Sequence, residues 1–180
     1  MFEIAAQLVG IVAMAFNILS YQQKTQKGVI GFQLFGSMLF AVNYFLLGAT
    51  VGGILNLVGT VRAVVFLNRE KTHAEHPAWL VGFTAVYLLS YLLTFTVFQK
   101  APTVFNLIVE FLPVIGMTAT TVSFRLKDAA TIRRFGLISS PSWLVYNIVN
   151  FSIGAICCEV LSLGSILVGM LRLDRGKGNR

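Results

Sequence analysis

Charged residues are scarce in this chain. Asp, Glu, Lys and Arg make up 12% of its 180 residues, about half of the roughly 25% that is usual in soluble globular domains. So few charges cannot cover a water-facing surface, and 56% of the residues are hydrophobic, with a mean hydropathy of +0.78. The composition therefore excludes a water-soluble enzyme, a secreted disulfide scaffold and an independent nucleic-acid-binding domain, and it indicates an integral membrane protein.

Cysteine and histidine are also scarce, with two of each. Cys157 and Cys158 are adjacent in an apolar stretch, and neighbouring side chains of a helix point in different directions, so we expect no disulfide between them. His73 and His76 lie in a short polar loop without matching ligands elsewhere, and no phosphate-binding loop or nucleophile–base arrangement is visible. We therefore predict that the protein is not an enzyme, and that it has no catalytic residues, metal or cofactor.

The apolar residues fall in long blocks, and a helix needs about 20 mainly apolar residues to cross the hydrocarbon of a bilayer. The sequence predicts seven such spans, over residues 4–21, 29–47, 51–66, 79–98, 105–124, 135–151 and 152–171. Two breaks rest on short polar or glycine-containing turns, near Gly48 and near Ser152. The N-terminal segment has no basic region and no clear cleavage site, so we expect it to be retained as the first helix.

The positions of the basic residues support this count. With seven spans, twelve of them fall on one side of the membrane: Lys24, Lys27, Arg69, Lys71, Arg125, Lys127, Arg133, Arg134, Arg172, Arg175, Lys177 and Arg180. Lys100 lies on the other side, and Arg62 lies within the third span. Because cytoplasmic loops carry the excess of Lys and Arg, the N-terminus is predicted to lie outside and the C-terminus inside the cytoplasm.

The two halves of the chain share one design. Ser20-Tyr21-Gln22-Gln23-Lys24 aligns with Ser123-Phe124-Arg125-Leu126-Lys127 at an offset of 103, and Gly48-Ala49 aligns with Gly154-Ala155 at an offset of 106. The pattern predicts an all-α membrane protein with two parallel three-helix repeats, residues 1–72 and 102–180, joined by a loop and linker helix over 73–101. Transporters with parallel repeats place their site at the repeat interface, near the bilayer midplane.

These residues carry a resemblance. The 3+1+3 order resembles the PQ-loop, SWEET and SemiSWEET superfamily, as does the sequence Tyr21-Gln22-Gln23-Lys24-Thr25-Gln26-Lys27-Gly28-Val29-Ile30-Gly31. Trp143-Leu144-Val145-Tyr146-Asn147 is similar to that superfamily's Trp-x-x-Tyr-Gly, and Asn56 lies in the region of its substrate-binding asparagine. More closely, the whole chain resembles the bacterial inner-membrane YgjV family. The resemblance implies a multi-pass inner-membrane protein with a SWEET-like bundle and a central solute pathway.

Three predicted spans contain a charged residue, which costs roughly 2.5–3.5 kcal/mol at the centre of a bilayer. Glu159 is too deep to reach the surface easily, so we expect it to face a buried partner or a cavity. Arg62 either snorkels to the cytoplasmic headgroups or forms a buried ion pair with Glu159. Glu110 either reaches the outer interface or pairs with a neighbouring helix.

Polar and aromatic residues in the spans form the candidate substrate site: Asn56, Trp143, Glu159, Asn43, Tyr146 and Asn147. Singly, the Asn side chains are also explained as hydrogen-bonding contacts between helices. The counterpart of Asn56 in the second repeat is Glu159 at one offset and Ser162 at the other. Pro141 is expected to interrupt the sixth helix, as a gating hinge or as a packing kink, and Gly48 and Gly154 are candidate hinges.

Two functions fit these features. The first is a facilitator or exchanger of a small polar solute with a central site between the repeats, and the second is a non-transporting membrane sensor or scaffold. The basic residues of the tail, 172–180, are expected to contact anionic lipid headgroups at the cytoplasmic face. No nucleic-acid partner is expected, and a homo-oligomer remains open.

Overall fold

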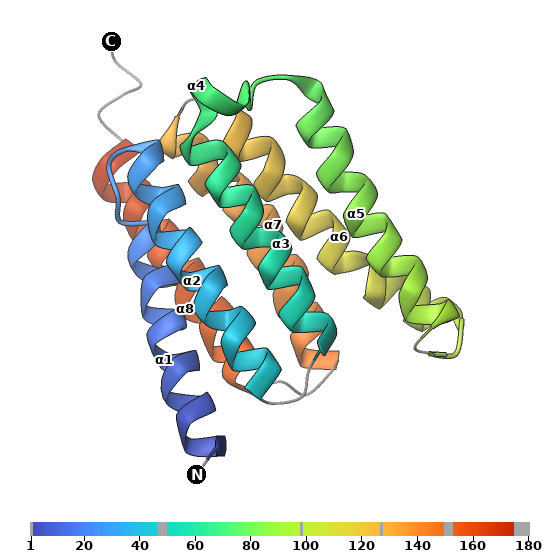
Figure 1. The fold of residues 1–180 in the computed structure, drawn as a ribbon. Coiled ribbons are helices and arrows are strands. Elements are labelled where there is room, and N and C mark those ends of the chain that lie inside the picture. The colour runs from blue at the N-terminus through green and yellow to red at the C-terminus, as the bar shows by residue number, and fades with distance from the viewer. Residues whose placement is uncertain (1, 47–49, 98, 127, 150–152, 175–180) are drawn as a thin grey trace.

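The computed structural model describes residues 2–46, 50–97, 99–126, 128–149 and 153–174. Within these ranges the chain forms eight α-helices, one π-helical turn and no strand (Figure 1). The elements are α1 (Phe2–Ser20), α2 (Gln26–Leu46), α3 (Thr50–Leu67), α4 (Arg69–Thr72), α5 (Pro77–Thr96), α6 (Val104–Arg125), α7 (Ala129–Val149), α8 (Ile153–Gly169) and η1 (Met170–Asp174). Helices satisfy their own backbone hydrogen bonds, which is what long apolar segments require in a bilayer.

Each predicted span contains one long helix, with ends within three residues of the prediction in every case except the start of α7. That helix begins at Ala129 instead of residue 135, because the Asp128 carboxylate accepts a hydrogen bond from the Thr131 backbone N–H at 3.1 Å and caps the first turn. Counting apolar residues alone missed this start, because Arg133 and Arg134 follow directly after the first turn. Helix α7 runs through Pro141 without ending there, and the gating hinge or packing kink expected at this residue stays a prediction.

Four helical segments of the described chain are long and apolar enough to cross a membrane: Gln26–Leu46, Pro77–Thr96, Val104–Arg125 and Gly154–Asp174. Two further apolar segments, Ala5–Ser20 and Gly53–Leu67, are shorter. The 21 residues of α7 include Arg133, Arg134 and several serines, which make it less apolar than its length alone would suggest. The fold is therefore that of a helical membrane protein.

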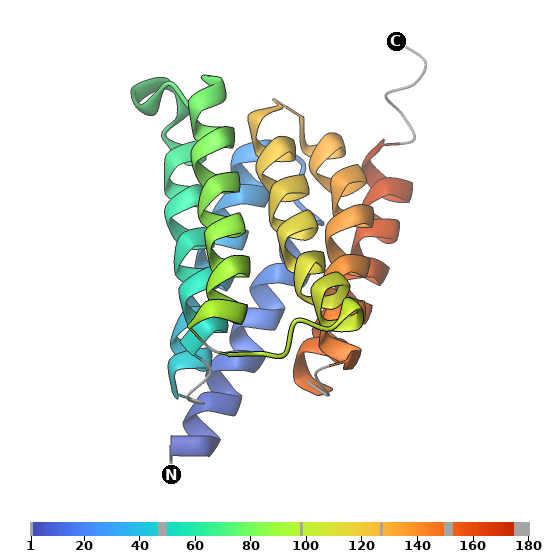
Figure 2. The same cartoon turned by 90° about the vertical axis from the view of Figure 1, so that its right-hand side faces the viewer.

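The long helices form two neighbouring groups. In the first, α2 packs between α1 and α3, and in the second, α7 packs between α6 and α8. Contacts between the groups join α1 to α8, α3 to α6 and α2 to α7, while α5 packs on α6 and α3 (Figures 1 and 2). Below, α1–α3 and α6–α8 are called the first and second half.

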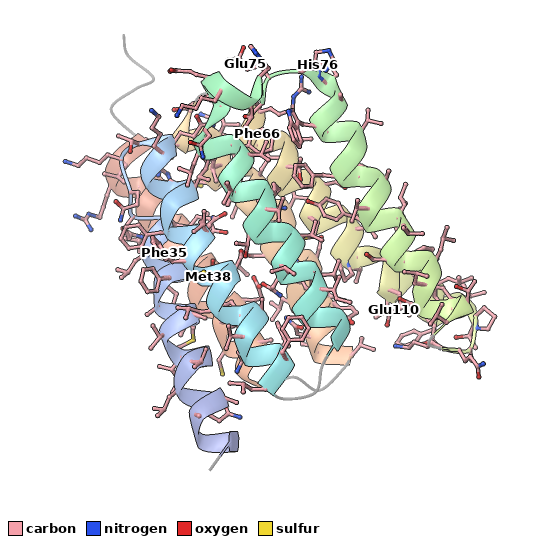
Figure 3. The ribbon with its side chains drawn as sticks, in the orientation of Figure 1. Phe35, Met38, Phe66, Glu75, His76 and Glu110 are labelled. Carbon is pink, nitrogen blue, oxygen red and sulfur yellow. The ribbon has the colours of Figure 1, made fainter. Side chains whose placement is uncertain are left out.

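The surface of the bundle is apolar and much of its interior is polar. Val81, Leu89 and Leu92 on α5 are each more than half exposed, and Phe35 and Met38 on α2 are exposed as well (Figure 3). The buried polar residues are Ser20, Gln33, Asn43, Arg62, Glu110, Thr121, Ser123, Arg133, Ser140, Asn147, Ser162 and Ser165. This distribution is the one that lipid on the outside favours, because hydrocarbon offers polar groups no hydrogen bonds.

One end of the bundle carries the α1–α2 and α6–α7 connections, and we call it the loop end (top of Figure 1). An apolar core lies here between α2, α3, α5, α6 and α7, and it includes Phe66 and Phe124, whose rings meet edge to face at 5.8 Å. The opposite end, where α2 gives way to α3 and α7 to α8, is called the turn end. The halves are therefore packed together most tightly at the loop end.

Arg133 of α7 connects three segments at the loop end. Its side chain is 1% exposed and forms an ion pair with Asp174 of η1. Its Nη1 donates hydrogen bonds to the carbonyl of Gln23 at 2.9 Å and to the carbonyl of Tyr21 at 3.4 Å. A guanidinium has five N–H donors in a fixed fork, so one residue of α7 can hold both the α1–α2 connection and the C-terminal turn.

Gly169 allows α8 to approach the α1–α2 connection. A Cβ at this position would lie 2.5 Å from the Tyr21 carbonyl oxygen and 2.9 Å from Cδ of Arg133. We expect Gly169→Ala to lower the free energy of unfolding by about 1–3 kcal/mol, as overpacking does. Thermal denaturation of the purified protein in detergent measures this.

The matched control is Gly164→Ala on the same helix, where a Cβ would meet nothing within 4 Å. Alanine stabilises a helix by up to about 1 kcal/mol relative to glycine, so this variant should unfold at the same temperature as the parent or slightly above it. Equal destabilisation by the two substitutions would contradict the close approach at Gly169.

Candidate functional site

A polar cavity of about 120 Å³ lies between the two halves. Each half contributes three helices to its wall, and α5 contributes none. Its lining residues are Asn17, Tyr21, Gln33, Ser37, Phe40, Tyr44, Leu55, Asn56, Gly59, Arg62, Met117, Thr120, Ser139, Ser140, Trp143, Asn147, Ala155, Cys158, Glu159 and Ser162. The cavity contains one acidic and one basic side chain, so its formal charge is balanced.

Arg62 forms part of the α3 wall and is 5% exposed. Its Nη1 group donates to the Met117 carbonyl at 3.2 Å, to the Tyr87 hydroxyl at 3.3 Å and to the Thr121 hydroxyl at 3.5 Å. Its guanidinium carbon lies 5.1 Å from the centre of the Phe124 ring, within the range of a cation–π contact. Helices α5 and α6 thus hold the guanidinium from behind, and no carboxylate of the described residues lies within ion-pair distance of it.

Glu159 lies on the α8 wall and is half-buried. Ser140 of α7 and Tyr21 line the same cavity as Glu159. Cys158, next to Glu159, is buried and also lines the cavity, whereas Cys157 is exposed. Both cysteines are free thiols.

The predicted Arg62–Glu159 ion pair does not form. Both side chains line the cavity. The ion pairs seen among the described residues are different ones, and they join Arg69 to Glu75, Lys100 to Glu110 and Arg133 to Asp174. The reason lies in the packing, because Nη1 of Arg62 is turned toward α5 and α6. Arg62 also does not snorkel, since it is buried.

The structure divides the predicted substrate residues into two groups. Asn56, Trp143, Asn147 and Glu159 line the cavity, and Arg62 joins them. Asn43 and Tyr146 do not. The Asn43 amide donates instead to the Ala6 carbonyl at 2.7 Å, which makes it a contact between α2 and α1. Tyr146 lines a separate, smaller cavity of about 20 Å³ beside α5.

The remaining predictions concern hinges and repeat equivalence. Gly48 lies outside the described residues, Gly154 is exposed with open space around it, and Pro141 is not part of the cavity wall. Both candidate counterparts of Asn56, Glu159 and Ser162, line the cavity, because they are three residues apart on one face of α8.

Glu110 forms an ion pair, as one of its two predicted alternatives required, but its partner lies in a loop and not on a neighbouring helix. It is 9% exposed, and Lys100 of the α5–α6 connection, instead of a neighbouring helix, donates to its carboxylate at 2.5 Å. Figure 3 shows Glu110 at the opposite end of the bundle from Glu75 and His76. Among the described residues, no group of three or more His, Cys, Asp and Glu side chains is placed to hold a metal.

Several lining residues were not predicted, among them Gln33, Ser37, Ser139 and Ser140. A usable signal was present, because the polar positions recur at helical spacing. On α2 they are Gln33, Ser37 and Tyr44, and on α8 they are Glu159 and Ser162. Residues separated by three or four positions lie on one helix face, so a narrow polar stripe on each apolar helix marks the side that faces the cavity.

The support of Arg62 generates a prediction. Tyr87 is 1% exposed, and its hydroxyl contacts both Arg62 and Thr121, the latter at 3.1 Å. Tyr87→Phe removes that oxygen and leaves a buried polar group with one partner fewer, so we expect a loss of about 1–3 kcal/mol in the free energy of unfolding. Tyr91→Phe, one turn further along α5, is the control.

The Tyr91 hydroxyl is exposed and makes only a 3.4 Å bond to the Leu107 carbonyl. Substitutions at such positions usually change stability by less than about 0.5 kcal/mol. Thermal denaturation of the two variants beside the parent measures the difference, and equal effects would show that the Tyr87 hydroxyl does not support Arg62.

Comparison with known proteins identifies the family. The family model Imp-YgjV, described as bacterial inner membrane protein, matches residues 4–177. No curated protein and no solved structure matches the chain. Since the match covers nearly the whole sequence, the chain belongs to this family of bacterial inner membrane proteins.

Proposed function

We propose that this bacterial inner membrane protein carries a small polar solute across the membrane, as a facilitator or exchanger. The observation that carries the proposal is the central polar cavity, walled by α1–α3 and α6–α8 inside a bundle with an apolar exterior. Concave sites with a few convergent polar groups are where proteins usually bind small molecules. Asn56, Trp143 and Glu159 are the residues proposed to contact the solute.

We further propose that the two halves are parallel repeats joined by α5. A two-fold relation between them would pair the first helix of each half with the third helix of the other, and the second helices with each other. The contacts of α1 with α8, α3 with α6 and α2 with α7 are the pairs that this relation requires. Together with the sequence resemblance to the PQ-loop and SWEET superfamily, they support a 3+1+3 arrangement.

In this proposal all seven long helices cross the membrane. The polar residues of α7 do not oppose this, since Arg133, Ser140 and Asn147 are buried in the bundle and do not face lipid. The loop end carries Lys24, Lys27 and Arg69 and is placed in the cytoplasm by the excess of basic residues. The N-terminus then lies outside.

Transport requires the halves to separate alternately at each end. Hydrogen bonds between the halves gather at the loop end, where the Gln22 amide donates to the Ser165 hydroxyl at 2.8 Å and the Gln26 amide to the Phe124 carbonyl at 2.8 Å. The cavity wall extends toward the turn end through Tyr44 and Leu55. We therefore propose that the described conformation is closed to the cytoplasm.

The orientation can be measured with reporter fusions. A fluorescent protein fused after residue 180 should fluoresce, because it folds in the cytoplasm, and alkaline phosphatase at the same place should be inactive. Fusions in the Lys100 loop should show the opposite pattern. Active phosphatase at residue 180 would overturn the proposed orientation.

Access to the cavity can be measured at Cys158. A small membrane-impermeant methanethiosulfonate should modify this thiol from both faces of the membrane, in right-side-out and in inside-out vesicles, if the halves separate alternately. Modification should be faster from the outside, because the loop end is closed in the described conformation. The Cys157→Ser variant supplies a chain in which Cys158 is the only thiol.

A Cys158→Ser variant that retains Cys157 is the control, since Cys157 is exposed on the outer surface of α8 and should show no dependence on the state of the cavity. A sensor or scaffold without a pathway should leave Cys158 unmodified from both faces, and that result would overturn the transport proposal.

A further inference from the structure

We propose that the solute is a small zwitterion, with its carboxylate held at Arg62 and its ammonium group at Glu159. The inference rests on the proposed function of the cavity as a solute site and names the chemical class that this site fits. Its basis is that two opposite charges face one small cavity without neutralising each other.

The first half of the argument is the incomplete pairing of Arg62. Arg62 is only 5% exposed to solvent, and Nη1 makes all of its hydrogen bonds to the described residues. Its Nε is buried without a partner. Its Nη2 lies 3.9 Å from the position of a Cβ at Gly59, another residue of the cavity wall.

A buried guanidinium that lacks an anion is costly, so groups of this kind are normally paired or hydrogen-bonded. Neutral oxygens of Tyr87, Met117 and Thr121 satisfy one amino group of Arg62 from behind, which leaves Nη2 to bind a ligand in the cavity. A carboxylate is the natural ligand, since arginine bonds to carboxylates are charge-assisted and directional.

The second half of the argument is Glu159 on a different wall. Ser140 lines the cavity beside it, and no cation among the described residues lies within ion-pair distance of its carboxylate. An ammonium group has three donors and no acceptor, so it matches a carboxylate and a nearby hydroxyl. Tyr21 and Ser162 offer further hydroxyl oxygens in the same lining.

Other classes of solute would leave at least one of the two charged side chains of the cavity unpaired. A simple anion would leave Glu159 without a cation, a simple cation would leave Arg62 without an anion, and a neutral sugar would leave both charges unpaired. The volume of about 120 Å³ is several times the roughly 10–15 Å³ that one water molecule needs, so the cavity has room for a solute of several heavy atoms. A zwitterion of the size of glycine, alanine or serine fits these limits.

The test measures thermal unfolding of the purified full-length protein in detergent over a concentration series of each probe. A ligand that binds only the folded state raises the unfolding temperature by mass action. The zwitterionic probes are glycine, alanine and serine. Glycinamide keeps only the cation, N-acetylglycine keeps only the anion, and glucose carries no charge.

We expect at least one zwitterion to raise the unfolding temperature in a saturable way, and its single-charge analogue to require roughly tenfold higher concentration or more for the same shift, since each analogue loses a charged hydrogen bond. This comparison uses the unaltered chain, so it does not depend on whether a variant folds. Equal saturable shifts by glycine and by either of its analogues would overturn the proposal, as would no shift by any of the three zwitterions.

Variants then place the two charges. In Arg62→Gln, glycinamide should stabilise the protein at a concentration closer to that of the zwitterion, because the variant has no unpaired cation that this probe leaves without an anion. In Glu159→Gln, N-acetylglycine should do so, because the variant has no unpaired carboxylate. Asn43→Ala is the control, since Asn43 lies outside the cavity, and it should keep the parent order of affinities.

Failure of the inference is distinguishable from failure of the proposed function. Saturable stabilisation by glucose alone, together with Cys158 modification from both faces, would overturn the zwitterion and leave the transport proposal standing. Stabilisation by a zwitterion with Cys158 closed from both faces would support the binding class and overturn transport.

Discussion

The structure depends on one constraint, which is that hydrocarbon offers no hydrogen bonds to polar groups. The backbone satisfies its own hydrogen bonds by forming helices, and the polar side chains face the interior of the bundle. Arg62, Arg133 and Asn147 are all buried, while leucine and valine side chains cover the outside of α5. Among the described residues, twelve polar side chains are buried, so the interior must either satisfy them mutually or contain a polar space.

Both solutions are present, and they occupy different levels of the bundle. At the loop end the polar groups satisfy one another, as Arg133 does with Asp174 and with the carbonyls of the α1–α2 connection. In the middle, Arg62 and Glu159 remain apart and line a cavity. The first arrangement holds the two halves together at the loop end in the described conformation, whereas the second leaves charges that a ligand can meet. A closed end next to an incompletely paired cavity is the geometry that our transport proposal requires.

The long helices could be predicted from the sequence because each depends on local composition. The exception is instructive, since α7 begins six residues before its predicted start. The six residues that were missed include Arg133, which an apolar count rejects, although Asp128 caps the start of the helix and the bundle buries Arg133. Part of the site was also predictable, because Asn56, Trp143 and Glu159 are polar or aromatic residues in apolar surroundings. Asn43 has the same local character, yet it bonds to Ala6 and lies outside the cavity.

The sequence by itself determined that the chain is an apolar helical membrane protein, where its long helices lie, and which faces of those helices are polar. These properties follow from composition and from the helical repeat, both of which are local. Only the tertiary structure decided which polar faces meet, that Arg62 turns toward Tyr87 and Thr121, and that Glu159 lines the same cavity without pairing with it. The reason is that a helical repeat defines a face but not the helix that this face meets, and that choice depends on the packing of all the helices together.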